Sequence, residues 1–383
     1  MDPVDRLILD EAPEPAGRVL VLDAPDLAAA VADRGWPVVA YADSLLLENH
    51  VTVPVIDRLP GQVVGSPMSQ PPMSGADNAP AVSTELADVD LVVLRLPKSV
   101  AALEEYAQRL AWLPRGVHVV AGGRVKHMTR SMNEALATRF GDVRASLGRQ
   151  KSRVLHAAEP TPGPIDYPRT AHHAELDLSL AAHGATFAGT RVDPGTRLLL
   201  TVLDQIAVPG QPTGDGRPVS GTAGRTDPGT TIDLGSGNGT LSALLARAGH
   251  QVLAIDESRA ACQATAATAA LNGVSVSVER ADGLAEQPTA SSGLIVCNPP
   301  FHVGTTKDSG PALAMIADAG RVLRPGGELW LVFNAHLPYL QSLRRIGQTE
   351  IVARNPKFIV TRTVRSDGNS AKPAPQSPER DHD

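Results

Sequence analysis

The sequence is poor in cysteine and lacks long apolar runs. Among 383 residues only Cys262 and Cys297 are cysteines, and their spacing fits neither a disulfide framework nor a zinc site. No apolar run approaches the roughly 20 residues that a membrane helix needs. The chain also starts without the basic-then-apolar layout of a signal peptide. From these absences we expect a cytoplasmic protein that uses no metal and no membrane.

Positive charge is scarce overall but concentrated in one place. The net charge is −6, which disfavours a general nucleic-acid binder, yet residues 115–153 hold nine Lys or Arg and two acids. This asymmetry predicts one local basic surface that contacts RNA phosphates, although an ordinary solvated face remains the alternative. The expected contacts are Arg124, Lys126, Arg130, Arg149, Lys151, Arg153 and Lys357.

Alternating strand and helix patterns predict an α/β protein with two halves. In the first half the expected strands are 18–22, 37–41, 88–96 and 117–121, with helices at 26–34, 100–110 and 126–140. In the second half the expected strands are 230–234, 251–255, 275–280, 293–297, 328–333, 350–354 and 358–364. Its helices are expected at 196–207, 240–248, 259–272, 310–323 and 338–346.

The remaining segments set the expected domain boundaries. We expect residues 1–16 to be loosely ordered, residues 60–80 and 209–229 to be insertions, and residues 175–192 to form a hairpin. The predicted domains are 1–165 and 170–366, followed by a disordered tail at 367–383.

A glycine-rich loop follows the strand at 230–234 and opens the next helix. The loop reads Asp233-Leu-Gly235-Ser236-Gly237-Asn238-Gly239, with evenly spaced glycines that permit close backbone approach to a ligand. Its spacing differs from the dinucleotide pattern, and the acid before it suits a ligand with a positive group. S-adenosylmethionine carries such groups. By contrast, the first strand-to-helix turn of the chain, residues 23–26, has no glycine, so we expect no cofactor there.

Acids also end the next two strands. Asp256, followed by Glu257, is placed to accept ribose hydroxyls, and Asp282, followed by Gly283, is placed to receive an adenine amino group. Each acid alone fits a solvated loop, but three acids at successive strand ends around one glycine loop predict a nucleotide-type site.

The stretch Asn298-Pro299-Pro300-Phe301 follows the strand at 293–297. Its prolines fix a rigid, extended exit from the sheet. The turn presents an amide, carbonyl oxygens and an aromatic ring, which suit a flat ligand with an exocyclic amino group. We therefore predict that these four residues are the catalytic ones. Cys297 is expected to be a core residue rather than a nucleophile.

These motifs resemble those of the class I S-adenosylmethionine-dependent methyltransferases, and more narrowly the two-domain ribosomal RNA guanine-N2 methyltransferases. The resemblance also includes Gly326-Gly327-Glu328 and Asn355-Pro356-Lys357, and nearly the whole chain. It implies two tandem Rossmann-like domains, the first degenerate and assisting RNA binding, the second catalytic with a seven-stranded mixed sheet. The large-subunit members look most similar.

The resemblance further implies that Phe187, Asp193 and Thr196 lie by the cofactor. It implies methyl transfer to the exocyclic N2 of a guanine, with ribosomal RNA or a ribosomal subunit as partner. We also expect a monomeric enzyme. Two alternatives stay open. Asn-Pro-Pro turns also serve N6-adenine and protein glutamine methylation, and a non-catalytic RNA-binding assembly factor belongs to a different functional class.

Overall fold

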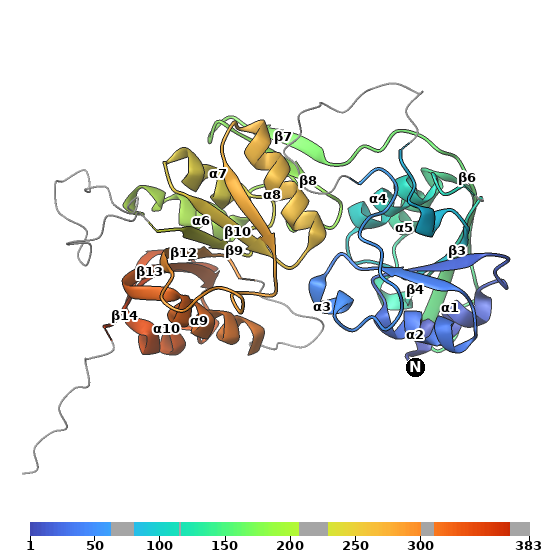
Figure 1. Cartoon of the computed structure of the whole chain (residues 1–383), viewed down its shortest axis with the longest axis horizontal. Coiled ribbons are helices and arrows are strands. Elements are labelled where there is room, and N and C mark those ends of the chain that lie inside the picture. Colours follow the sequence, from blue (N-terminus) through green and yellow to red (C-terminus); the bar gives the residue numbers. More distant parts are fainter. Residues whose placement is uncertain (63–79, 115, 207–228, 300–309, 368–383) are drawn as a thin grey trace, which may run out of the picture. The chain divides into compact units, whose positions relative to one another are not determined.

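The computed structural model describes residues 1–62, 80–114, 116–206, 229–299 and 310–367 (Figure 1). The two expected insertions and the expected tail lie almost wholly outside these residues. The described chain divides into two compact units. One holds residues 1–193, 235–248 and 252–283, and the other holds 194–234, 249–251 and 284–383. The domain boundaries expected at 165–170 from the sequence stay a prediction.

Six strands form the first sheet in the order β2-β1-β3-β4-β6-β5. Neighbouring strands from β2 to β4 run parallel, and β6 pairs antiparallel with both β4 and β5. The buried faces consist mainly of Val and Leu, which suit strands covered on both sides. The strands are β1 Arg18–Leu22, β2 Val38–Tyr41, β3 Val89–Arg95, β4 His118–Arg124, β5 Phe140–Ala145 and β6 Ser152–Pro160.

Five helices accompany these strands in the described residues. They are α1 Pro3–Glu11, α2 Pro25–Asp33, α3 Leu45–Glu48, α4 Val100–Leu110 and α5 Arg130–Ala137. Short 3₁₀ turns lie at Thr84–Leu86 and Val125–His127. Helix α5 is shorter than the helix expected at 126–140, because β5 already begins at Phe140.

The expectation that residues 1–16 are loosely ordered is wrong for α1. Asp2 caps this helix by accepting from the Val4 N–H at 2.7 Å, and Pro3 occupies its first turn. Ile8 is fully buried, and a Cβ added at Gly122 on β4 would lie 2.4 Å from the Ile8 Cγ1. Helix α1 therefore packs directly on the first sheet.

Seven strands form the second sheet in the order β11-β10-β9-β12-β13-β15-β14, which confirms the expected seven-stranded mixed sheet. Strands β9, β12 and β13 pair parallel, as do β10 and β11, whereas β15 pairs antiparallel with β13 and β14. The strands are β9 Thr231–Leu234, β10 Val252–Asp256, β11 Val276–Arg280, β12 Ser292–Cys297, β13 Leu323–Asn334, β14 Gly347–Arg354 and β15 Phe358–Arg365.

The helices of the second half follow the expected alternation. They are α6 Pro194–Leu200, α7 Thr240–Arg247, α8 Arg259–Leu271, α9 Gly310–Val322 and α10 Leu340–Ile346, with a 3₁₀ turn at Leu203–Gln205. Helix α6 ends earlier than the helix expected at 196–207. Among the described residues the longest helices have 13 residues, and none is long and apolar enough to cross a membrane.

The two sheets share one plan. Without β11, the second order β10-β9-β12-β13-β15-β14 repeats the first order β2-β1-β3-β4-β6-β5, including the antiparallel strand near the edge. In this correspondence β2 matches β10 and β3 matches β12. The turns after these strands are therefore equivalent places in the two halves.

The expected hairpin at 175–192 lies earlier than predicted. Strands β7 Arg169–His173 and β8 Leu178–Ala182 pair antiparallel, and residues 183–190 are turns. The hairpin is anchored on α8, because the Ala181 N–H donates to the Thr268 Oγ1 at 2.9 Å and the Ser179 N–H to the Asn272 Oδ1 at 2.9 Å. These side-chain anchors, which pattern reading does not show, fix the position of the hairpin.

Candidate active site

The glycine loop leads into α7 in a backbone conformation that needs glycine. Gly237 and Gly239 have φ angles of +56° and +76°, in the left-handed region. A Cβ added at Gly239 would also lie only 2.8 Å from the Thr265 Cα on α8. Any larger residue at 239 would push the loop away from α8. Glycine is therefore required here both for its left-handed φ angle and for the close contact with α8.

Two buried polar residues of the loop fix its shape. The Asn238 amide nitrogen donates to the Gly189 and Arg191 carbonyls at 2.8 and 3.0 Å, which places the segment after Phe187 beside the loop. The Ser236 hydroxyl accepts from the Thr265 hydroxyl at 3.0 Å. The loop is thus braced from two sides, and Ser236 and Asn238 act mainly on the loop itself.

Asp256 ends β10 and connects the glycine loop with the turn before α8. Its Oδ2 accepts from the Gly237 N–H at 2.9 Å, and its Oδ1 accepts from the Ser258 N–H at 3.0 Å. Burial raises the pKa of this carboxyl, and the backbone N–H donors lower it. Each carboxylate oxygen has a second lone pair, so Asp256 can also accept from ligand hydroxyls.

The other expected cofactor residues of this unit are more accessible. The Phe187 side chain is 65% exposed, and Asp193 is half-buried. Asp282 is exposed two residues after β11, followed by Gly283 with a φ of +69°. The structure therefore leaves Phe187 and Asp282 exposed to solvent. The Glu257 side chain is instead held by Ser44, whose hydroxyl donates to its Oε2 at 2.5 Å.

The other unit holds the remaining polar residues of the expected site. Asp233 is buried on β9, in register with Val296 of the parallel strand β12. Asn298 follows β12, and its Nδ2 donates to the Oγ1 of the buried Thr196 on α6 at 3.0 Å. This bond holds the nitrogen of the amide at α6, and Oδ1, the acceptor atom, is the other end of the same planar group. Pro299 is buried behind it.

Neither cysteine has the properties of a nucleophile. Cys297 is 1% exposed, and burial together with the Asp233 charge raises the pKa of its thiol well above the ordinary value. Burial raises the pKa of the Cys262 thiol to about 12. Since the thiolate is the reactive form, both thiols are inert near neutral pH. The expectation that Cys297 is a core residue is confirmed.

The expected basic residues other than Lys357 lie near the end of β4 and the start of β6. Strand register pairs Arg124 with Ser152, and the Val125 N–H donates to the Lys151 carbonyl at 2.9 Å. Acids neutralise part of this charge: Arg124 pairs with Asp2 at 3.2 Å, Arg130 with Glu134 at 3.1 Å, and Arg149 with Asp10. Within the described ranges, three exposed side chains of this group form no ion pair: Lys126, Lys151 and Arg153.

Three other expected site residues lie elsewhere. Pro300 and Phe301 fall outside the described residues. Lys357 is exposed before β15, with its Nζ 5.1 Å from the centre of the Phe358 ring. In the part of the chain that the structure describes, no group of His, Cys, Asp or Glu side chains is arranged to hold a metal ion.

Sequence reasoning missed two threonines that support the loop. On α8, the Thr265 hydroxyl donates to Ser236, and the Thr268 hydroxyl donates to the Asn238 carbonyl at 2.8 Å. Both are fully buried on one face of the helix. Their three-residue spacing within an alanine-rich helix was the available signal for a polar contact face.

Two family models match this chain. Residues 73–161 match the family model of the RLMG N-terminal domain, and residues 177–362 match the model of the methyltransferase small domain. A ribosomal RNA large subunit methyltransferase G from Ectopseudomonas mendocina is 35% identical over 294 residues, covering 75% of this chain and 74% of the relative. The protein of that name from Streptomyces coelicolor is 36% identical over 292 residues, with 72% of each chain covered.

A solved structure shares the fold over almost the whole chain. The T. thermophilus 16S rRNA N2 G1207 methyltransferase, solved with AdoMet and guanosine, superposes with a TM-score of 0.69 at 22% identity. The match covers 95% of this chain and 92% of that one. The fold is therefore the Rossmann-like methyltransferase fold. With the extent and identity of the sequence matches above, the chain belongs to the family of the ribosomal RNA large subunit methyltransferases G.

Proposed function

We propose that this protein transfers the methyl group of S-adenosylmethionine to the exocyclic N2 of a guanine in ribosomal RNA. The observation that carries the proposal is the Asn298 amide, which ends β12 and is held by Thr196 beside a neutral, buried Cys297. An oriented amide oxygen suits an amino group as methyl acceptor. Methylation of a pyrimidine carbon would need a reactive thiol instead. The names of the relatives support ribosomal RNA as the substrate.

The cofactor site that we propose is made of the glycine loop and the acids around it. The residues present fit S-adenosylmethionine, because a Cβ added at Gly237 would meet no described atom within 4 Å, which leaves the loop backbone open to a ligand, and Asp256 offers carboxylate lone pairs for two ribose hydroxyls. We assign Asp282 and Gly283 to the adenine end, and Asp233 and Thr196 to the amino acid end. The proposed cofactor-binding residues are Phe187, Asp193, Thr196, Asp233, Gly235, Ser236, Gly237, Asn238, Gly239, Asp256, Glu257, Asp282, Gly283 and Asn298.

The proposed mechanism relies on positioning. Guanine N2 is a poor nucleophile because its lone pair is delocalised into the ring. Asn298 Oδ1 and the Pro299 carbonyl accept the two amino hydrogens, which favours tetrahedral nitrogen and directs the lone pair toward the methyl group. Bound S-adenosylmethionine supplies an activated methyl on its sulfonium. The gain is orientation and electrostatics, and the proton leaves to water after transfer. Pro300 and Phe301, which lie outside the described residues, complete the catalytic set that we propose, and Phe301 is assigned to stacking on the base.

We assign RNA binding to the basic surface near the end of β4 and the start of β6. Lys126, Lys151 and Arg153 are exposed and carry charge that no described acid neutralises, so they should contribute most to phosphate binding. A smaller contribution to phosphate binding is expected from the other proposed contacts, Arg124, Arg130, Arg149 and Lys357. We further propose that the enzyme acts as a monomer in the cytoplasm, where its ribosomal substrate is made.

Methyl transfer to isolated RNA tests the proposal. Ribosomal RNA from cells that lack the gene is incubated with purified protein and S-adenosylmethionine carrying a labelled methyl group. Digestion to nucleosides and mass spectrometry should then show N2-methylguanosine. Label on N6 of adenosine, label on a protein glutamine, or binding of RNA without transfer would each replace the proposed reaction by one of the alternatives named from the sequence.

A further inference from the structure

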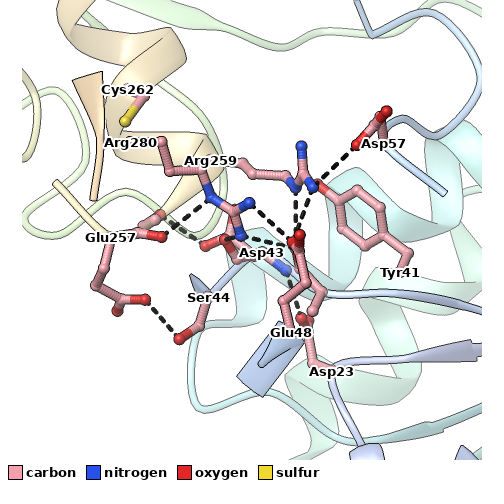
Figure 2. A network of polar contacts seen from close by, with 12 residues as sticks. Asp23, Tyr41, Asp43, Ser44, Glu48, Asp57, Glu257, Arg259, Cys262 and Arg280 are labelled. Carbon is pink, nitrogen blue, oxygen red and sulfur yellow. Dashed lines mark hydrogen bonds and ion pairs between the residues drawn. The ribbon is translucent and has the colours of Figure 1, made fainter. Parts of the chain in front are cut away.

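A polar network joins the end of β2 to the turn before α8 (Figure 2). The Leu45 N–H donates to the Glu257 carbonyl at 3.0 Å, and the Arg259 N–H donates to the Asp43 carbonyl at 2.9 Å. These two bonds surround an isolated antiparallel bridge between Ser44 and Ser258. Two short segments more than 200 residues apart in sequence therefore pair like a minimal sheet.

The Asp43 carboxylate caps the N-terminus of helix α8, although Asp43 lies far from this helix in the sequence. Its Oδ1 accepts from the Ala260 N–H at 2.8 Å, and its Oδ2 accepts from the Ser258 hydroxyl at 2.6 Å. Ser258 is itself the N-cap, since its hydroxyl accepts from the Ala261 N–H at 3.1 Å. A negative charge at a helix N-terminus is favourable, so Asp43 supplies a second cap that α8 lacks on its own.

Two arginines compensate the acids around this contact. Arg280 donates to the Asp43 carbonyl at 3.0 Å and to the Glu257 carbonyl at 3.2 Å (Figure 2). Glu48 accepts from both Arg259 and Arg280 at 2.8 Å. Arg280 also stands opposite Asp256 in the β10–β11 register. The contact between the segments around Asp43 and Ser258 therefore includes β11, the edge strand beside β10, which ends at Asp256.

A continuous series of hydrogen bonds runs from Asp43 to the glycine loop. Asp43 accepts from the Ser258 hydroxyl, the Ser258 N–H donates to Asp256, and the Gly237 N–H donates to the other oxygen of Asp256. Each bond restricts the next group, because Asp256 keeps its rotamer only while Ser258 and Gly237 keep their places. The carboxylate orientation at the end of β10 thus depends on Asp43.

We propose that Asp43 is a positioning residue that sets the affinity for S-adenosylmethionine without touching it. Asp43 follows β2, the strand that corresponds to β10 in the shared sheet plan, where Asp256 stands. The acid of the degenerate half holds the acid turn of the catalytic half. This inference rests on the proposed function, because it takes Asp256 as the ribose acceptor.

Cofactor titration of matched variants tests the inference. In Asp43→Ala, the Kd and KM for S-adenosylmethionine should rise about tenfold, with kcat at saturation within about twofold of wild type. Asp43→Asn keeps one oxygen acceptor and should raise Kd only about threefold. The matched control is Asp57→Ala, because Asp57 pairs with Arg259 at 3.3 Å but is 78% exposed, and such pairs contribute little. Its Kd should stay within about twofold.

The thermal unfolding midpoint is measured for each variant, since a purely structural role would lower it without changing Kd. Native affinity in folded Asp43→Asn and Asp43→Ala, or failure of both to fold, would overturn the inference. Asp256→Ala in the same titration separates the two proposals. If it binds like wild type, the proposed cofactor site is wrong; if it loses affinity while the Asp43 variants do not, only the positioning role is wrong.

Discussion

Replacing Thr196 by valine should slow methyl transfer by releasing the Asn298 amide. Valine keeps the shape of threonine but removes the acceptor of the 3.0 Å bond from the Asn298 Nδ2. Thr196 is 7% exposed, and a neutral hydrogen bond of this kind contributes about 0.5–1.5 kcal/mol. If that free energy keeps the amide oxygen directed at the substrate, the rate constant should fall roughly 2- to 12-fold.

Single-turnover methyl transfer at saturating cofactor and RNA measures this rate constant directly. Thr196→Ser retains the hydroxyl and should stay within about twofold of wild type. Thr201→Val is a matched control. Thr201 directly follows the same helix, and its hydroxyl is exposed and donates to the Leu198 carbonyl. A folded Thr196→Val protein with the wild-type rate would refute the idea that this bond orients Asn298.

Three further predictions concern the cofactor, the RNA and pH. Asp256→Ala should weaken S-adenosylmethionine binding at least tenfold in calorimetry, since each bond to a charged acceptor is worth roughly 1.5–3 kcal/mol; unchanged affinity would contradict the assignment. Replacing Lys126, Lys151 and Arg153 by glutamine should flatten the salt dependence of RNA binding by roughly two units, with cofactor affinity unchanged, whereas an unchanged slope would mean a merely solvated face. Burial raises the pKa of Asp23 to about 6, so folding favours its protonated form, and Asp23 should add about 1.4 kcal/mol to the unfolding free energy between pH 7.5 and 5. Burial also raises the pKa of Asp43, Asp256 and Glu257, so denaturant unfolding at both pH values should show a change about 1.4 kcal/mol larger in wild type than in Asp23→Asn; equal pH dependence would exclude Asp23 as a source.

The sequence predicts what local chemistry determines. The glycine loop could be predicted because Gly237 and Gly239 adopt left-handed φ angles, which few other residues allow. Apolar runs also predicted β1 to β4 of the first half and the seven strands of the second sheet. The equivalence of the two halves was visible only as a similar alternation, and the matching strand orders now give it a topological basis.

Features that depend on distant partners could not be predicted. Helix α1 has only nine residues, and its burial depends on Gly122, far along the chain. The pair β5–β6 carries exposed charged residues, which hide its strand pattern. The sequence assigned no role to Asp43, because its contacts with Ser258 and Ala260 exist only in the folded chain.

The most direct test of the central claim is the rate and product of methyl transfer by Asn298→Ala. Because one preorganised polar partner is lost, its single-turnover rate on ribosomal RNA should fall by about 10²-fold or more, with RNA affinity nearly unchanged. The wild-type product should be N2-methylguanosine. Transfer by Asn298→Ala at the wild-type rate, or a wild-type methyl group on a pyrimidine carbon, would contradict the mechanism and make Cys297 the residue to test.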